Sequence, residues 1–454
     1  MNLELVTLTE TTAIVTWYTG TPGLGGGQLQ PSPADTEILL GSSPSTLRTV
    51  YHRDEHTPFH YAEISGLEPG RTYFYQARSG GVPAVPSPFA LGNLLGTSTL
   101  STSNLANPIT PFMFTTPHPP PGRYLFSVAL ANDVHMGETV AGLAKTLPIV
   151  GGVPPGISQV AGEPPYPVVM CEAMVADAKA RGADALIVAG DVASEAAPKD
   201  LATVRHLLGG FGTYHRDWFV ARGNHDRPHQ GADYNSCRAV PGSSGEHDCF
   251  DDTFFGPHKS WFSTDLFGMH LTCLDTYDKL GNGADNGKLS PAQFDWFTKD
   301  LAAHKDQPTL VFGHHPLTLE STLVNIEPVV FDLDLQQAQQ IQSLYAKSPG
   351  VFFHHAGHTH RNHRTQSTVA PRVTFQEVAA TKEYPGGFTM LRVHTGGYAV
   401  NFYKTRSDLA REWTERSRQE YFGLNPLYTL GNFGDRNYVV ARDMSGLRPA
   451  HHGH

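Results

Sequence analysis

The sequence lacks the features that mark several common classes of protein. Its 454 residues contain no run of 18 or more apolar residues, so no membrane span is expected. The 33 Lys and Arg residues are outnumbered by 43 Asp and Glu residues, which argues against binding a nucleic-acid backbone through a basic surface. Hydrophobic residues at 39% and charged residues at 17% indicate a globular chain rather than a disordered one.

The beginning of the chain has no charged and apolar signal segment, because Met1 to Trp17 already has the pattern of strands. The protein is therefore either made without an export signal, and so cytoplasmic, or shown here as a mature exported form. The sequence does not choose between these two, and it leaves the oligomeric state open.

Cysteine is also scarce, with four residues in all. Cys171 falls in a predicted helix and Cys273 in a predicted strand, where a buried free thiol is the ordinary interpretation. Cys237 and Cys249 flank a loop rich in Gly and Pro that could be closed by a disulfide. Spacing alone does not establish the geometry that a disulfide needs, so both states of this pair stay open.

What the sequence does contain is a series of polar clusters, each placed at the end of an apolar run. A buried strand that ends in ligand-type residues at a tight turn is how an open α/β sheet presents its chemistry at the carboxyl edge. In chain order the clusters are Asp133-Val134-His135, Gly190-Asp191, Gly223-Asn224-His225-Asp226, Gly313-His314-His315-Pro316 and Gly357-His358-Thr359-His360.

Together these clusters offer two carboxylates, one amide and at least four imidazoles, with no thiolate among them. About seven such ligands are too many for one tetrahedral ion and suit two ions that share a bridging ligand. Oxygen and imidazole ligands are compatible with Mn, Fe or Zn, so the identity of the two divalent or trivalent ions stays open.

The surrounding patterns divide the chain into three segments. Residues 1–117 contain short alternating runs with turn residues between them, which predicts an antiparallel β-sandwich. Residues 118–403 alternate strands with helical patterns, as in a layered α/β domain, with two long insertions at about 136–166 and 227–260 as candidate walls of a substrate pocket. Residues 404–454 form an extension that we expect to pack on this domain, ending in His451, His452 and His454, which we interpret as a frayed end.

Two family resemblances refine this division. Thr16-Trp17 followed by the segment from Ile64 to Tyr75 resembles a fibronectin type III module. The ordered polar clusters resemble the calcineurin-like metallophosphoesterases over roughly residues 124–395. The second resemblance implies a layered αββα sandwich and a dinuclear metal-dependent hydrolase, with the Leu274-Asp275-Thr276 and Gln293-Phe294-Asp295-Trp296 segments in their usual place; we interpret Asp275 as structural and Trp296 as part of the core.

The metallophosphoesterase resemblance also implies roles for individual residues. Asp133, His135 and His360 would hold the first ion, Asn224, His314 and His358 the second, and Asp191 would bridge both. A metal-bridging hydroxide would attack the phosphorus of a small phosphomonoester or phosphodiester. His225 would act as the general acid, which suits an imidazole because its pKa of about 6.5 lies near working pH.

Four neighbours of these residues are further candidates. Asp226 would orient His225, although a turn hydrogen bond is an equal alternative. His315, Arg222 and Arg227 are candidate contacts of the substrate phosphate. For His315 the alternative is a contact that supports the metal ligands, and for the two arginines it is a solvated surface position.

A sandwich followed by this catalytic domain is similar to the domain order of purple acid phosphatases, but the motifs differ. That family has a Tyr three residues after the bridging Asp, and its phenolate binds ferric iron and gives the colour; Ser194 stands at that position here. The family also lacks the imidazole that His135 provides. We therefore predict no purple band.

A second hypothesis is a non-catalytic binding or adhesion protein that uses the sandwich, with the metal domain as scaffold. Such a protein usually loses a ligand or the catalytic histidine, and this chain retains both. A nuclease acting on long DNA is a third hypothesis, disfavoured by the acidic balance of charge.

Overall fold

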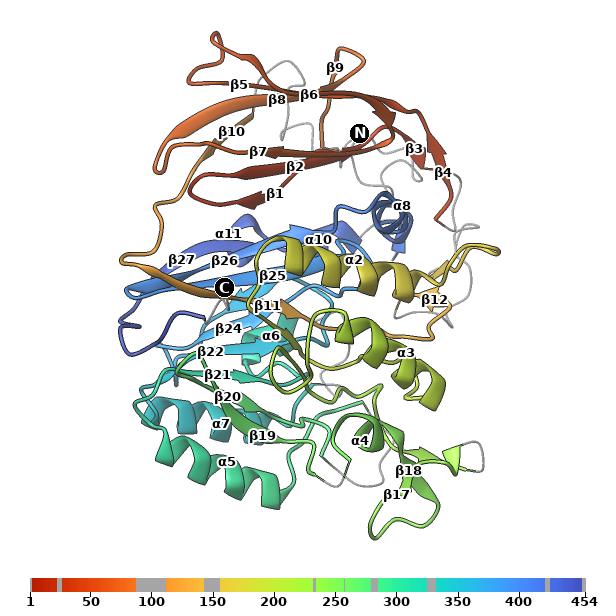
Figure 1. The fold of residues 1–454 in the computed structure, drawn as a ribbon, viewed down its shortest axis with the longest axis vertical. Coiled ribbons are helices and arrows are strands. Elements are labelled where there is room, and N and C mark those ends of the chain that lie inside the picture. Colours follow the sequence, from red (N-terminus) through yellow and green to blue (C-terminus); the bar gives the residue numbers. More distant parts are fainter. Residues whose placement is uncertain are drawn as a thin grey trace.

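The computed structural model describes residues 2–22, 27–86, 112–142, 156–231, 234–256, 258–278, 285–324, 332–420 and 425–450. Parts of both insertions and the terminal histidines His451, His452 and His454 lie outside these ranges. Figure 1 shows a β-sandwich stacked on a larger domain of sheets and helices.

The N-terminal domain is an antiparallel β-sandwich, as its alternating runs predict. Burial along β5 alternates between core and surface, which is the period-two pattern of a sheet with one buried face. Trp17, Ile38 and Tyr75 meet between the sheets. One sheet consists of β1 (Glu4–Leu8), β2 (Ala13–Tyr18) and β7 (Phe59–Ile64), and the other of β10 (Phe112–Thr115), β8 (Thr72–Ser79), β5 (Ala34–Gly41) and β6 (Arg48–Thr57), with β9 (Val82–Pro83) on β8 and a separate hairpin of β3 (Gly20–Pro22) and β4 (Leu29–Pro31).

The larger domain is built on two six-stranded mixed sheets. Its parallel strands are continuous apolar runs, as expected for strands that are covered on both faces. The first sheet has the order β15 (Trp218–Val220), β14 (Ala185–Val188), β11 (Tyr124–Ala131), β25 (Gly387–His394), β26 (Gly397–Lys404) and β27 (Asn437–Ala441). The second has the order β19 (Phe262–Leu266), β20 (Met269–Cys273), β21 (Thr309–Phe312), β22 (Val351–Ala356), β24 (Thr374–Glu377) and β23 (His363–Thr365).

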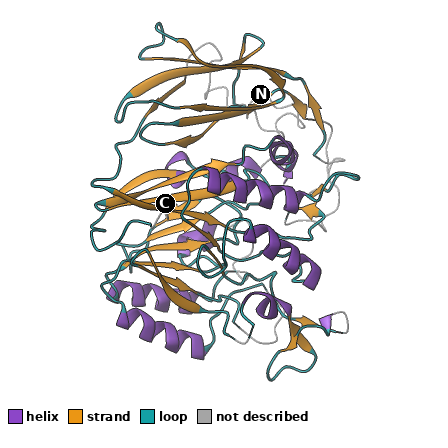
Figure 2. Ribbon diagram, in the orientation of Figure 1, coloured by secondary structure: helices purple, strands orange, loops and turns teal. Residues whose placement is uncertain are grey.

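The two sheets pack face to face and helices cover their outer faces (Figure 2). α2 (Tyr166–Ala180), α3 (Pro198–Gly209) and α4 (Cys249–Phe254) pack on the first sheet, and α5 (Pro291–Ala303) and α7 (Leu335–Lys347) pack on the second. Ser290 caps the N-terminus of α5, because its hydroxyl accepts the Gln293 N–H at 3.2 Å. The predicted αββα layering is confirmed.

The remaining short elements lie in the insertions, after β21 and near the C-terminus. The paired strands are β12 (Val140–Ala141) with β13 (Ile157–Ser158), and β16 (His229–Gln230) and β17 (Arg238–Ala239) with β18 (Glu246–Asp248). The helices are α6 (Leu319–Val324), α8 (Asp408–Ser417), α10 (Asn425–Thr429) and α11 (Phe433–Arg436).

Strand β1 of the sandwich lies against β26 and the C-terminal segment. Asn401 Nδ2 donates to the Leu8 carbonyl at 2.8 Å, and Asn437 Nδ2 donates to the Val6 carbonyl at 2.9 Å. Arg436 Nη2 donates to the Leu5 carbonyl at 3.0 Å. The segment after residue 404 therefore contacts both domains, while the boundaries at 117 and 403 stay a prediction.

Cys237 and Cys249 form a disulfide with their Cα atoms 4.8 Å apart, and Cys171 and Cys273 are buried free thiols. Trp296 is partly buried against the core under α5 and α7. Within the described ranges, no helix combines the length and the apolar character needed to cross a membrane.

Candidate metal centre

The predicted ligands stand at the ends of five strands. Asp133 follows β11, Asp191 follows β14 and Asn224 follows β15, which are neighbours in the first sheet. His314 follows β21 and His358 follows β22, which are neighbours in the second sheet. Because parallel strands end at the same edge of a sheet, two packed sheets bring these turns together.

The backbone at these turns has an unusual conformation. Eight described residues other than glycine have a positive φ, and five of them are predicted ligands. Positive φ costs free energy for residues with a side chain and persists where the surrounding structure enforces it, commonly at functional sites. The five are Asp133 (50°), His135 (47°), Asp191 (50°), His358 (71°) and His360 (54°).

Two glycines of the motifs are required because neighbouring atoms leave no room for a Cβ, and not because of their φ angles. A Cβ on Gly223 would collide with the backbone N and the carboxylate of Asp191, and a Cβ on Gly357 would lie 2.7 Å from Asp133 Oδ2. A side chain at either position would push a carboxylate out of place. The glycines before Asn224 and His358 therefore allow the ligand turns to pack together.

The first group of ligand atoms gathers around Asp133. His360 Nε2 lies 3.3 Å from Asp133 Oδ1, and His135 Nε2 lies 3.7 Å from the same oxygen. His135 Nε2 is also 3.5 Å from Asp191 Oδ2. Asp133 Oδ1 and His135 Nε2 are buried and make no hydrogen bond. Such converging polar atoms fit a cation, since buried groups otherwise find partners.

The second group gathers around Asn224. His314 Nε2 lies 2.9 Å and His358 Nδ1 lies 3.1 Å from Asn224 Oδ1. His314 Nε2 is also 3.1 Å from Asp191 Oδ2, the oxygen that faces His135 in the first group. One carboxylate oxygen of Asp191 therefore faces both groups, as a bridging ligand would.

The pKa shifts separate the ligand imidazoles into neutral ones and protonated ones. Burial opposes ionisation of Asp133, yet the neighbouring His360 imidazole holds its pKa well below the usual range. Burial lowers the pKa of His135 to about 4 and that of His358 to about 3, so both imidazoles are neutral near pH 7. Burial also acts on His314, but the Asp191 carboxylate raises its pKa to about 9. The protonated His314 carries a positive charge beside Asp191. A metal ion would displace this proton and take over its charge, because an imidazole must be deprotonated to bind a metal.

His225 is oriented by a backbone carbonyl. Its Nδ1–H donates to the Ser194 carbonyl at 2.8 Å. This hydrogen bond orients the ring and leaves Nε2 as the nitrogen that can face a ligand. The His225 amide donates to Asp191 Oδ1 at 2.9 Å, and its ring lies 4.7 Å from that of His135. Unlike the ligands of both groups, His225 is only partly buried.

Asp226 does not take the orienting role suggested for it. Its carboxylate accepts the backbone N–H groups of Val192 at 3.1 Å, Ala193 at 3.0 Å and Gly223 at 3.0 Å. It therefore joins the Gly190-Asp191 turn to the Gly223-Asn224 turn, which is the turn role that the sequence left as the alternative. The orientation of His225 comes from Ser194 instead.

Arg222 is buried, contrary to the solvated position that competed with a phosphate contact, and its guanidinium is occupied by protein groups. Its Nε donates to Asp275 Oδ2 at 2.9 Å, and its Nη2 donates to Asp248 Oδ2 at 2.8 Å. Its Nη1 donates to the Asp226 carbonyl at 3.1 Å. These partners occupy the guanidinium, so Arg222 does not offer a face for a phosphate. Asp275 has the structural role predicted for it.

His315 is likewise buried, with both ring nitrogens occupied. Nδ1 lies 2.7 Å from Thr276 Oγ1 and Nε2 lies 2.8 Å from the Asp285 carbonyl. It therefore supports the site from behind rather than facing a phosphate. Arg227 keeps 25% of its side chain exposed while donating to Asp285 Oδ1 at 2.9 Å. Its phosphate contact stays a prediction.

The sequence-based prediction missed three buried charged residues next to the first group. Glu383, Lys382 and Glu138 have at most 2% of their side chains exposed. The only sequence signal was a charged pair, Lys382-Glu383, between the runs that form β24 and β25.

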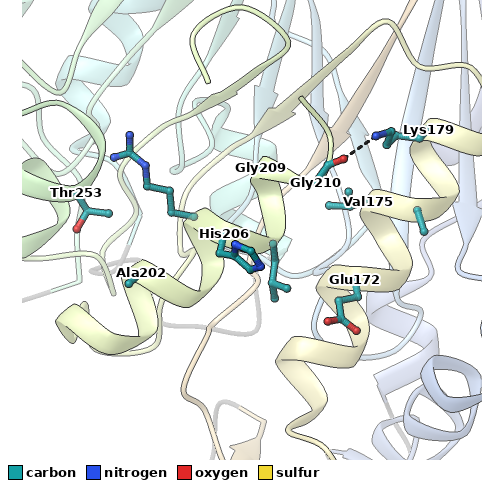
Figure 3. Close-up of a pocket in the computed structure, with 11 residues that line it drawn as sticks. Glu172, Val175, Lys179, Ala202, His206, Gly209, Gly210 and Thr253 are labelled. Atoms are coloured by element: carbon teal, nitrogen blue, oxygen red, sulfur yellow. Dashed lines mark hydrogen bonds between the residues drawn. The ribbon is translucent and has the colours of Figure 1, made fainter. Parts of the chain in front are cut away.

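Two further features lie outside the ligand set. An open groove of about 1100 Å³ between α2 and α3, shown in Figure 3, is lined by residues that include Glu172, Lys179 and His206, and by none of the predicted site residues. His270, Asp300 and His304 also lie close together. The rings of His270 and His304 are stacked 3.8 Å apart and Asp300 pairs with His270, so these side chains already have partners within the protein.

Comparison with known families agrees with this geometry. The family model for calcineurin-like phosphoesterases matches residues 126–362, just over half of the chain, and the protein belongs to that family. The model for the N-terminal domain of purple acid phosphatases matches residues 1–89. The protein is thus a calcineurin-like metallophosphoesterase with the domain architecture of purple acid phosphatases.

Solved structures show similarity at low sequence identity. A dimetal phosphatase from Danio rerio is 14% identical, with coverage of 62% of this chain and 96% of that chain and a TM-score of 0.44. A purple acid phosphatase from yellow lupin (Lupinus luteus) seeds is 14% identical, with coverage of 98% and 74% and a TM-score of 0.43. No curated protein matches the sequence.

Proposed function

We propose that the protein hydrolyses small phosphomonoesters or phosphodiesters at a dinuclear metal centre. The observation that carries this proposal is the pair of ligand groups that share one oxygen of Asp191, 3.5 Å from His135 Nε2 and 3.1 Å from His314 Nε2. Asp133, His135 and His360 hold the first ion; Asn224, His314 and His358 hold the second; Asp191 holds both. Two Mn, Fe or Zn ions at these residues supply Lewis acidity and an activated water.

The protein's own residues contribute proton transfer and positioning. The His225 Nδ1–H donates a hydrogen bond to the Ser194 carbonyl, which orients the ring so that Nε2 faces the substrate. A protonated Nε2 then donates its proton to the oxygen of the leaving group. Its neighbour Arg227, partly exposed, binds a phosphate oxygen. Asp226 acts indirectly, because it holds the two turns that carry Asp191 and Asn224.

Metal analysis combined with matched substrates tests the proposal. We expect the purified protein to hold two metal ions per chain and to hydrolyse 4-nitrophenyl phosphate, bis(4-nitrophenyl) phosphate or both. The ratio of the two rates decides between monoester and diester preference. A fully metallated protein that is inactive on both compounds and on nucleotides would refute the proposed hydrolase activity and favour the binding or adhesion hypothesis.

A further inference from the structure

Behind the first group of ligands lies a buried ionic cluster, which we define as Glu138, Lys382 and Glu383. Glu383 Oε1 is 2.6 Å from His360 Nδ1. Since a carboxylate can only accept here, His360 Nδ1 carries a proton toward Glu383, and Nε2 faces Asp133, 3.3 Å away. Glu383 thereby selects the ring nitrogen that is available to a metal ion.

The second carboxylate of the cluster stands behind the other imidazole of the first group. Glu138 Oε2 lies 3.9 Å from His135 Nδ1, and the Glu138 amide donates to the His135 carbonyl at 3.0 Å. Glu138 therefore belongs to the same turn as His135. Both imidazoles of the first ion have a carboxylate on the side away from Asp133.

Lys382 connects the two carboxylates. Its ammonium group hydrogen-bonds Glu138 Oε2 and lies 3.5 Å from Glu383 Oε2. The Lys382 amide donates to the Asp133 carbonyl at 3.2 Å, which ties the cluster to the turn of a third ligand. One lysine thus holds the supports of His135 and His360 at a fixed separation.

The second group of ligands differs from the first at His314, whose Nδ1 donates to a neutral partner, the Ala189 carbonyl, at 2.8 Å. His358 has a carboxylate nearby, with Asp332 Oδ1 4.0 Å from its Nε2, a distance comparable to that between Glu138 and His135. A carboxylate makes a ligating imidazole a stronger donor than a backbone carbonyl does, and it fixes the ring. Burying three charges costs free energy unless they form ion pairs and hydrogen bonds with one another or with a nearby charged site.

We propose that Glu138, Lys382 and Glu383 form a positioning unit that orients His135 and His360 and strengthens binding of the first ion. This inference rests on the proposed dinuclear centre and concerns metal affinity rather than the hydrolytic step. Glu383 is its principal member, because its contact with His360 is short and direct.

Substitution of Glu383→Gln tests the unit, because glutamine keeps the length of the side chain and an accepting oxygen but loses the charge. Zn²⁺ titration of the metal-free protein by calorimetry gives the Kd of each ion. We expect the Kd of the first ion to rise roughly 10- to 100-fold and that of the second to change little. The visible spectrum of the Co²⁺-loaded protein should change, since it reports the ligands of the ion.

Asp300→Asn provides a matched control. Asp300 Oδ2 is 3.0 Å from Nε2 of the buried His270, so this variant also neutralises a carboxylate paired with an imidazole, but one remote from the ligand set. We expect wild-type metal affinity and an unchanged Co²⁺ spectrum for Asp300→Asn.

The possible outcomes are decisive. Wild-type affinity and an unchanged Co²⁺ spectrum for Glu383→Gln would overturn the inference. If Glu383→Gln does not fold, Glu138→Gln tests the same unit through His135, with a smaller expected loss because its distance is 3.9 Å. Failure of both variants to fold beside a folded Asp300→Asn would assign the cluster a purely structural role. A wild type that binds two ions but hydrolyses no ester would refute the proposed function while leaving this test intact.

Discussion

Replacing Arg222 with methionine distinguishes a structural arginine from one that binds phosphate. The side chain of Arg222 is 4% exposed, and its guanidinium pairs with Asp275, with Asp248 and, at 3.4 Å, with Asp251. Asp275 is 2% exposed and Asp248 is 12% exposed, so neither carboxylate can be fully solvated once the arginine is gone. Breaking a buried ion pair from one side typically costs about 3 to 5 kcal/mol. We expect Arg222→Met to lose that much free energy of unfolding.

The loss should also depend on pH. Burial raises the pKa of Asp275 to about 7 even though Arg222 lowers it. The folded protein therefore binds a proton that the unfolded chain has already released, and it loses the stability linked to this proton as the pH rises from roughly 4 to 7. Without Arg222 the pKa of Asp275 rises further, and the variant continues to lose stability above pH 7. The difference in unfolding free energy between wild type and Arg222→Met should therefore widen from pH 7 to pH 9.

Urea unfolding at several pH values measures both effects, and steady-state kinetics provides the contrast. Arg227→Met is the matched control, because Arg227 is 25% exposed and its partner Asp285 is 36% exposed. A partly exposed pair of this kind contributes less than a buried one, on the order of 1 kcal/mol. If Arg222→Met unfolds like the wild type while its KM for 4-nitrophenyl phosphate rises, the structural interpretation of Arg222 is wrong.

Four further predictions concern the acid, the metal, the disulfide and the sandwich. His225→Ala should lower kcat by roughly 10² to 10⁴ and leave the metal content unchanged; loss of metal would instead identify His225 as a ligand. The iron-loaded protein should show no tyrosinate absorption in the visible range, and a strong band of that kind would contradict the ligand set. Replacing both Cys237 and Cys249 with serine should reduce the unfolding free energy by about 3 kcal/mol, the loop-closure value for a separation of 12 residues, which urea unfolding measures. Burial, aided by Arg411, lowers the pKa of His60 to about 3, so the sandwich should lose stability as pH falls from 6.5 toward 3, by about 1.4 kcal/mol per pH unit; His60→Gln should flatten that slope in thermal melts.

Local sequence patterns were sufficient for the sheets and for the set of candidate ligands. Each ligand cluster follows an apolar run, and a strand that leads into a tight turn is determined by residues close together in the chain. The order of the clusters then indicated that their turns meet at one sheet edge. The antiparallel sandwich and the layered α/β domain could be predicted for the same reason, whereas the αββα order of the layers came from the resemblance to metallophosphoesterases.

The partners of the charged side chains were decided only by the tertiary structure. Arg222 pairs with Asp248 and Asp275, which lie 26 and 53 residues further along the chain. Lys382 reaches Glu138 across 244 residues. No local pattern encodes such contacts, because they depend on which loops the packed sheets bring together. The sequence by itself determined which residues are candidate metal ligands, and the fold decided which charged groups lie beside them and which protein groups occupy Arg222.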